Sequence, residues 1–134
     1  MTGVGTLRIK RRPHPSLVKR SKRGFCGYPI ATVAWYGPDN KRASKVAVGI
    51  VPGENQEATA LERWFSAEGD VRFDAAIGKA IVDFIVQHGA QSVVMADRIM
   101  GCPHEEGSDY PEGTRCPQCP YWATRDRWSG EIIQ

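Results

Sequence analysis

Apolar and β-branched residues gather in two short runs in the first half of the chain. Residues 30–36 (IATVAWY) and 45–51 (KVAVGIV) have the composition of strands. Between them, residues 37–41 bring together glycine, proline, aspartate and asparagine, which is typical of a turn. The two runs therefore predict a β-hairpin, and Pro52-Gly53 ends its second strand.

The polar and apolar pattern changes after the hairpin. Residues 60–66 alternate, and we expect a short third strand there. Apolar residues then recur at helical spacing, which predicts a helix over 75–88, with Asp74 as its N-cap and Gly89 as its C-terminal stop. Residues 91–96 (QSVVMA) follow as a short apolar strand, which we expect to be buried on both faces.

This order of elements, β-β-β-α-β, predicts a small α+β domain over residues 24–99. If the last strand pairs parallel to an earlier one, the helix crosses one face of a mixed sheet. The order resembles the first half of the ribonuclease H-like fold, in which clustered acids hold a catalytic metal. However, the first strand has no acid and Asp97 alone cannot form such a cluster.

Composition places the chain among ordinary globular proteins. Its 134 residues suit one domain, and 41% hydrophobic with 25% charged residues suit a soluble one. No apolar run approaches the roughly 20 residues that a membrane helix needs. We therefore expect a cytoplasmic protein without a membrane span.

Charge is distributed unevenly along the sequence. Residues 1–23 contain eight Lys or Arg and no acid, whereas the rest has fifteen acids and ten Lys or Arg. With glycines, prolines and no apolar periodicity, this basic arm is expected to be disordered. It is either a solvated tail or an electrostatic attachment to nucleic acid or an anionic surface. The basic residues are Arg8, Lys10, Arg11, Arg12, Lys19, Arg20, Lys22 and Arg23.

Three of the four cysteines lie close together near the C-terminus. Cys102-Pro-His104 is followed, after eleven residues, by Cys116-Pro-Gln-Cys119. Thiolates and imidazoles are the usual ligands of structural zinc, which takes four of them in a tetrahedron. The spacing predicts a zinc-knuckle-like metal loop within residues 100–128, packed on the domain. Free thiols, or a disulfide within the second pair, are the alternative.

Other residues bear on this metal loop. Three thiolates and a neutral His104 would leave a formal charge of −1 around Zn²⁺, which Arg115 could offset. Asp97, expected at the end of the last strand, could accept a hydrogen bond from the other ring nitrogen of the histidine; a solvated carboxylate is the alternative. Cys26 could replace His104 as a ligand, or be a small buried hydrophobe. Residues 129–134 are expected to be a flexible C-terminus.

Two other metal chemistries share part of this pattern. It resembles the Rieske signature Cys-x-His … Cys-x-x-His, which binds a [2Fe–2S] cluster, although Cys119 stands where the second histidine belongs. It also fits the zinc-deaminase pattern His-x-Glu … Cys-x-x-Cys. In that family the two halves lie on separate helices, whereas only nine residues separate Glu106 from Cys116 here. Glu105 and Glu106 are therefore interpreted as exposed acids.

The tail as a whole resembles that of a group of small, uncharacterised bacterial proteins. The residues that carry the resemblance are Gly101–Gly107 (GCPHEEG), Asp109-Tyr-Pro, and Cys116–Trp122 (CPQCPYW). It extends over residues 24–128 and implies a shared domain and metal site, but no reaction. Together these patterns predict a non-enzymatic zinc-binding domain that forms a surface for a protein or nucleic acid.

Overall fold

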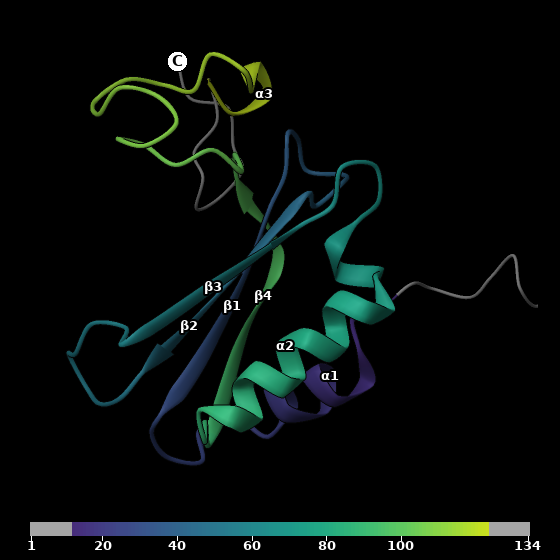
Figure 1. The fold of residues 1–134 in the computed structure, drawn as a ribbon, viewed down its shortest axis with the longest axis vertical. Helices are drawn as coiled ribbons and strands as arrows, with labels where there is room; N and C mark the ends of the chain where they lie inside the picture. Colours follow the sequence, from purple (N-terminus) through teal and green to yellow (C-terminus); the bar gives the residue numbers. More distant parts are fainter. Residues whose placement is uncertain (1–11, 124–134) are drawn as a thin grey trace, which may run out of the picture.

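A four-stranded mixed sheet forms the centre of the protein, which a computed structural model describes over residues 12–123 (Figure 1). Strands β1 (Ile30–Tyr36), β2 (Lys45–Val51) and β3 (Ala60–Phe65) form an antiparallel meander, and β4 (Ser92–Gly101) pairs parallel to β1. The strand order is β3-β2-β1-β4. The predicted α+β class, hairpin and third strand are confirmed.

Two helices lie side by side against one face of this sheet, as Figure 1 shows. Helix α1 (Pro15–Lys22) precedes β1, and α2 (Ala75–Gln87) connects β3 to β4 after the short 3-10 helix η3 (Val71–Phe73). A final turn, α3 (Pro120–Ala123), lies in the C-terminal segment. No helix among residues 12–123 is long and apolar enough to cross a membrane.

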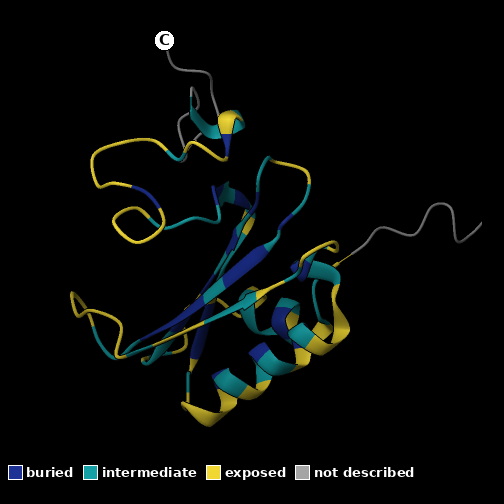
Figure 2. Cartoon of the chain, turned by 45° about the horizontal axis from the view of Figure 1, so that its top comes forward, coloured by how far each residue is buried: buried dark blue, intermediate teal, exposed yellow. Residues whose placement is uncertain are grey.

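The core lies between the helices and one face of the sheet. Alternate residues of β1, among them Val33 and Trp35, point to this face and are almost fully buried. They belong to one cluster with Ile81 and Ile85 of α2 and Leu17 of α1. Figure 2 shows buried positions along the strands and on the inner sides of the helices. Burial of these side chains supplies the main driving force for folding.

The opposite face of the sheet carries no helix. Leu61, Phe65 and Val94 point to it, with 52%, 64% and 59% of their surfaces exposed. The prediction that the last strand is buried on both faces is therefore wrong. A strand in an antiparallel or mixed sheet can leave one face open to water, and the crossover helix here covers only one side.

Helix α1 contradicts the expected disorder over the second half of the basic arm. The Nδ1 atom of His14 accepts a hydrogen bond from the backbone N–H of Ser16, and Pro15 occupies the first helical turn. Leu17 is 1% exposed and anchors the helix on the sheet. A single anchoring leucine gives no periodicity, which is why the pattern concealed this helix. Residues 1–11 lie outside the described part.

Strand β4 is longer than predicted. It continues to Gly101, past a register irregularity opposite the end of β1. There the indole N–H of Trp35 donates to the backbone carbonyl of Ala96, and Ile99 returns to the core with 2% exposure. The expected boundary between residues 99 and 100 therefore falls inside a strand. Because β4 runs to the far end of the sheet, it carries the metal motif there.

Candidate metal centre

Strand β4 delivers the first pair of candidate ligands to one end of the sheet. Gly101 pairs with Tyr36, the last residue of β1, and its carbonyl accepts a hydrogen bond from Gly37. The chain then leaves the sheet at Cys102 and forms the loop at the top of Figure 1. We call residues 102–119 the metal loop. The sheet therefore fixes the position of its first ligand.

The side chains of the two cysteine motifs meet at one point. The four ligand atoms of Cys102, His104, Cys116 and Cys119 all lie within 4.8 Å of one another. The Nδ1 atom of the histidine is 3.3, 3.3 and 3.5 Å from the three sulfurs, in chain order. Bonds from one tetrahedral zinc ion to sulfur and nitrogen would place such atoms about 3.5 Å apart. The cluster could therefore hold one metal ion, as the spacing predicted.

Backbone hydrogen bonds shape each half of the metal loop. The N–H of His104 donates to the sulfur of Cys102 at 3.3 Å, which favours a thiolate there. The N–H of Cys119 donates to the carbonyl of Cys116 at 3.5 Å, closing the Cys-Pro-Gln-Cys turn. Between them, the buried Tyr110 accepts a backbone bond from Gly107 and closes the intervening loop. Local turns therefore bring the second pair back to the first.

Two of the three cysteines in the cluster are largely shielded from water. Cys102 is 7% exposed and Cys119 is 2% exposed. Burial raises the pKa of both thiols, because the negative thiolate loses its hydration. A bound cation would reverse this preference, since a metal displaces the proton and neutralises the thiolate. Burial therefore disfavours free thiolates at these two positions, whereas thiolates bound to a cation are favoured.

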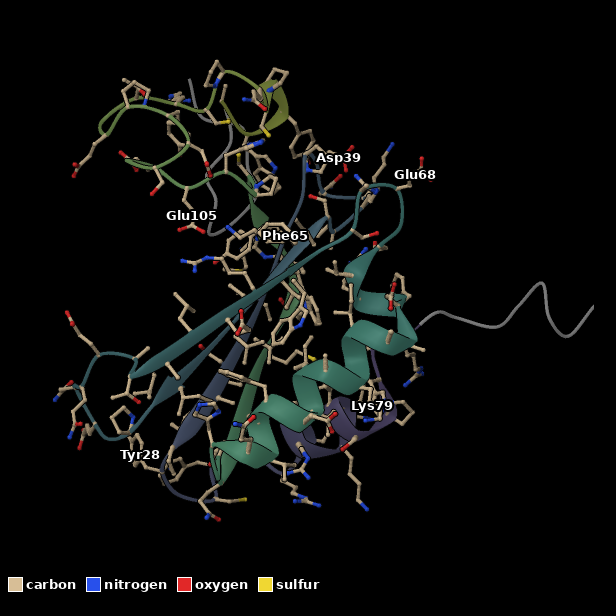
Figure 3. All side chains as sticks on the ribbon, viewed as in Figure 1. Tyr28, Asp39, Phe65, Glu68, Lys79 and Glu105 are labelled. Carbon is tan, nitrogen blue, oxygen red and sulfur yellow. The ribbon has the colours of Figure 1, made fainter. Side chains whose placement is uncertain are left out.

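An ion-pair cluster fastens the metal loop to the sheet, and the sequence did not reveal it. Lys45 of β2 is only 4% exposed, and its ammonium donates to the Pro103 carbonyl at 2.9 Å and to the Glu105 carboxylate at 2.7 Å. Arg63 of β3 donates to the same carboxylate at 3.0 Å. Figure 3 shows Glu105 beneath the loop, near the labelled Phe65.

This cluster corrects the interpretation of Glu105 as an exposed acid. The hydrogen bond from Lys45 is the main reason that the pKa of Glu105 lies below its usual value, and Arg63 adds to it. Because its partners lie on strands 42 and 60 residues earlier in the chain, no local pattern could indicate the pairing. Glu106, by contrast, is exposed as expected, and accepts a bond from the N–H of Gly113.

A cavity lies beside the metal loop. It has a volume of about 740 Å³ and opens between the loop and the ends of β2 and β3. Lys45, Arg63 and Glu105 line it together with His104 and the exposed ring of Phe65. The candidate metal ligand His104 therefore forms part of the cavity wall.

Cys26 does not belong to the cluster. It is exposed, and its backbone N–H donates to the hydroxyl of Ser92, at the start of β4. The ten residues of that strand separate it from the metal loop by roughly 30 Å. Both interpretations of Cys26, as an alternative ligand and as a buried hydrophobe, are therefore wrong.

Asp97 and Arg115 were both predicted to support the ligands, and the two predictions fare differently. Asp97 lies in the middle of β4 and is exposed, and no hydrogen bond among the described residues joins it to His104. The predicted role fails because the strand continues past it. Arg115 is exposed and lines a cavity of about 110 Å³ together with the three cysteines. Its role in offsetting the charge of the site stays a prediction.

Comparison with known proteins adds no family to this picture. No protein-family model matches the chain, and neither does any curated protein or solved structure. The resemblance of the tail to small bacterial proteins stays a prediction.

Proposed function

We propose that this protein is a zinc-binding domain in which the metal has a structural role. The observation that carries the proposal is the convergence of three sulfurs and one imidazole nitrogen within 4.8 Å. Three thiolates and one histidine are a common ligand set of structural zinc. Four protein ligands complete a tetrahedron, so no position remains for a catalytic water. The ion fastens the metal loop to the end of the sheet.

The same distances argue against the Rieske-like alternative. In a [2Fe–2S] cluster the protein ligands divide between two irons, which are joined by bridging sulfides. Ligand atoms on opposite irons are then separated by the whole cluster, and all four would not lie so close together. The spacing therefore supports a single ion. Its thiolates require a reducing compartment, and we assign the protein to the cytoplasm.

Metal analysis of the purified full chain tests this proposal. We expect about one zinc per chain and a colourless protein, whereas iron with visible absorption would overturn the assignment. Replacement of zinc by Co²⁺ should give the absorption of a tetrahedral thiolate site. A spectrum without thiolate-to-cobalt bands would show that the sulfurs are not ligands.

Two cysteine variants make a matched pair. Cys116→Ser removes one ligand and should reduce the zinc content of the protein well below one per chain. Cys26→Ser makes the same chemical change at the exposed cysteine outside the cluster and should leave the zinc content unchanged. Equal zinc contents in the two variants would contradict the ligand assignment.

The cavity beside the metal loop supports a role as an interaction module. Its walls combine charged groups with the exposed Phe65 ring, a mixture that suits a protein partner better than an apolar ligand. Loss of the metal would free His104 from the second ligand pair and leave this wall held mainly by the ion pairs of Glu105. We therefore expect partner binding at this cavity to require zinc, and a pull-down with and without a chelator to show that dependence.

A further inference from the structure

The basic residues of α1 are concentrated on its exposed side. Lys19, Lys22 and Arg23 are spaced three and four positions apart, which places them on one side of a helix, whereas the buried Leu17 lies on another. None of the three side chains forms an ion pair within the described residues. Residues 12–30 contain no acid. This end of the protein therefore presents uncompensated positive charge.

An exposed aromatic pair follows directly after these charges. Phe25 is 68% exposed, and its ring meets that of Tyr28 edge to face, with 5.4 Å between centroids. The loop that carries them is tied down by Ser92, whose hydroxyl accepts from the N–H of Cys26 and donates to the carbonyl of Gly27, both at 2.7 Å. Phe25 is thus presented to solvent by a fastened loop.

A groove of about 270 Å³ lies beside Phe25. It runs between the end of α1 and the start of β4, and its walls include Ser21, Gly24, Phe25, Ile30, Val94 and Met95. This volume is just below the roughly 300–1,000 Å³ of pockets for drug-sized ligands, so it suits one planar ring system. An aromatic wall, apolar sides and adjacent cations match the two parts of a nucleotide, a flat base and a phosphate.

We propose that this surface binds single-stranded nucleic acid, with one base stacked on Phe25 and the phosphates facing Lys19, Lys22 and Arg23. The site lies at the opposite end of the sheet from the metal loop, near the labelled Tyr28 in Figure 3, and does not depend on the proposed metal. A single strand is favoured over a duplex because only an unpaired base can leave its stack and enter the groove.

A lipid surface is the other anionic partner, and the structure disfavours it. An amphipathic helix binds a membrane through its apolar face, but the apolar side of α1, with Leu17, is buried against the sheet. That leaves chiefly the Phe25 ring for insertion, beside a half-exposed Tyr28. Stacking requires only one ring face, so the geometry suits a base better than a bilayer.

Fluorescence anisotropy of a labelled 12-nucleotide single strand tests the proposal with the full chain. Phe25→Ala should weaken binding between about 5-fold and about 150-fold, the range of one stacked base. Val86→Ala is the control, since this apolar side chain is also exposed, at 56%, but lies on α2 outside the groove. It should leave the affinity unchanged.

Charge variants and competing ligands complete the design. Replacing Lys19, Lys22 and Arg23 by Gln should flatten the salt dependence of binding by about two units of log–log slope. Lys79→Gln on α2, the control, should not alter that slope.

The proposal is overturned if no strand binds at low salt, if Phe25→Ala binds as well as the parent, or if a duplex binds as tightly as the single strand. Binding to phosphatidylserine vesicles but not to the oligonucleotide would also overturn it.

Discussion

The indole N–H of Trp122 donates a hydrogen bond of 2.8 Å to the backbone carbonyl of Gly37, in the turn between β1 and β2. The same glycine donates its N–H to Gly101, the last residue of β4. The hairpin turn therefore holds the chain on both sides of the metal loop, through the backbone just before it and through an indole just after it. This link does not involve the candidate ligands, so it positions the loop before any metal binds.

Trp122→Phe should weaken that link while keeping an aromatic ring against the core. Loss of the hydrogen bond leaves the Gly37 carbonyl without this donor, and we expect the free energy of unfolding to fall by about 1 kcal/mol. Zinc should also dissociate faster, because the second ligand pair is less well held. Urea unfolding and the rate of zinc transfer to a chelator measure both effects. An unchanged transfer rate would show that the metal alone holds the loop.

Glu105→Gln tests the ion-pair cluster. The buried Lys45 ammonium would lose its carboxylate partner, which destabilises the folded state. Because the Glu105 side chain is 39% exposed, water can replace part of the interaction, so we expect a loss of about 1–2 kcal/mol rather than that of a fully buried pair.

The exposed pair of Lys79 and Asp83 on α2 is the control for this variant. Both side chains are well exposed, at 74% and 64%, so Asp83→Asn should leave the urea midpoint nearly unchanged. Equal shifts in the two variants would contradict a special role for Glu105. The effect of Glu105→Gln should also disappear in acid, because the lowered pKa of Glu105 means that its stabilisation is lost as protonation occurs.

Asp70 gives the fold a second dependence on pH. Its carboxylate accepts bonds from Arg72, in both backbone and side chain, and from the N–H of Ala43. Burial would raise the pKa of Asp70, but these hydrogen bonds outweigh it and hold the pKa below its usual value. The stabilisation is therefore present above about pH 4 and is lost as the pH falls through the folded-state value.

Asp70→Asn should accordingly destabilise the protein near pH 6 and matter much less in strong acid. We expect a loss of about 1.5–3 kcal/mol at the higher pH, the usual range for hydrogen bonds to a charged group. Urea unfolding of parent and variant at pH 6 and pH 3 measures the difference. A constant difference at the two pH values would refute the assignment to ionised Asp70.

Leu17→Ala tests whether α1 belongs to the domain. The side chain is 1% exposed within the main core, so its truncation should cost about 2–5 kcal/mol. Phe25→Ala, eight positions later, removes a larger but exposed side chain and should have little effect on stability. Thermal unfolding compares the two. A small effect of Leu17→Ala would restore the prediction of a disordered arm.

Metal binding should release protons, because burial raises the pKa of the thiols of Cys102 and Cys119. Both thiols are protonated at neutral pH without metal, and zinc must displace those protons. Each displaced proton lowers the affinity tenfold per unit fall in pH, so these two thiols alone give about a hundredfold. Competition with a chelator at pH 6.5 and pH 7.5 measures this slope. An affinity that is independent of pH would exclude thiolate ligation.

Local pattern was sufficient for most of the sheet and for α2. The strands at residues 30–36 and 45–51 follow from β-branched composition, and the α2 boundaries follow from Asp74, which accepts from the N–H of Ile77, and from Gly89 at φ +65°. The pairing of the two cysteine motifs was also predictable, because their turns are local. These features depend on residues a few positions apart.

Contacts between distant segments could not be read in this way. Helix α1 is held by one leucine, β4 runs past its expected end because β1 lies beside it, and Glu105 is paired by strands far earlier in the chain. The predicted roles of Asp97 and Cys26 were wrong for the same reason. The surroundings of Asp97 depend on where β4 ends, and those of Cys26 depend on where β4 begins.

The sequence by itself determined most of the strands of the sheet and the two cysteine motifs able to hold a metal ion, with His104 or Cys26 left open as the fourth ligand. Only the tertiary structure decided where that ion would lie, which carboxylate fastens its loop, and which ring stands exposed beside the basic helix. The physical reason is that burial and ion pairing depend on which segments meet in space, and a local sequence pattern does not specify those contacts.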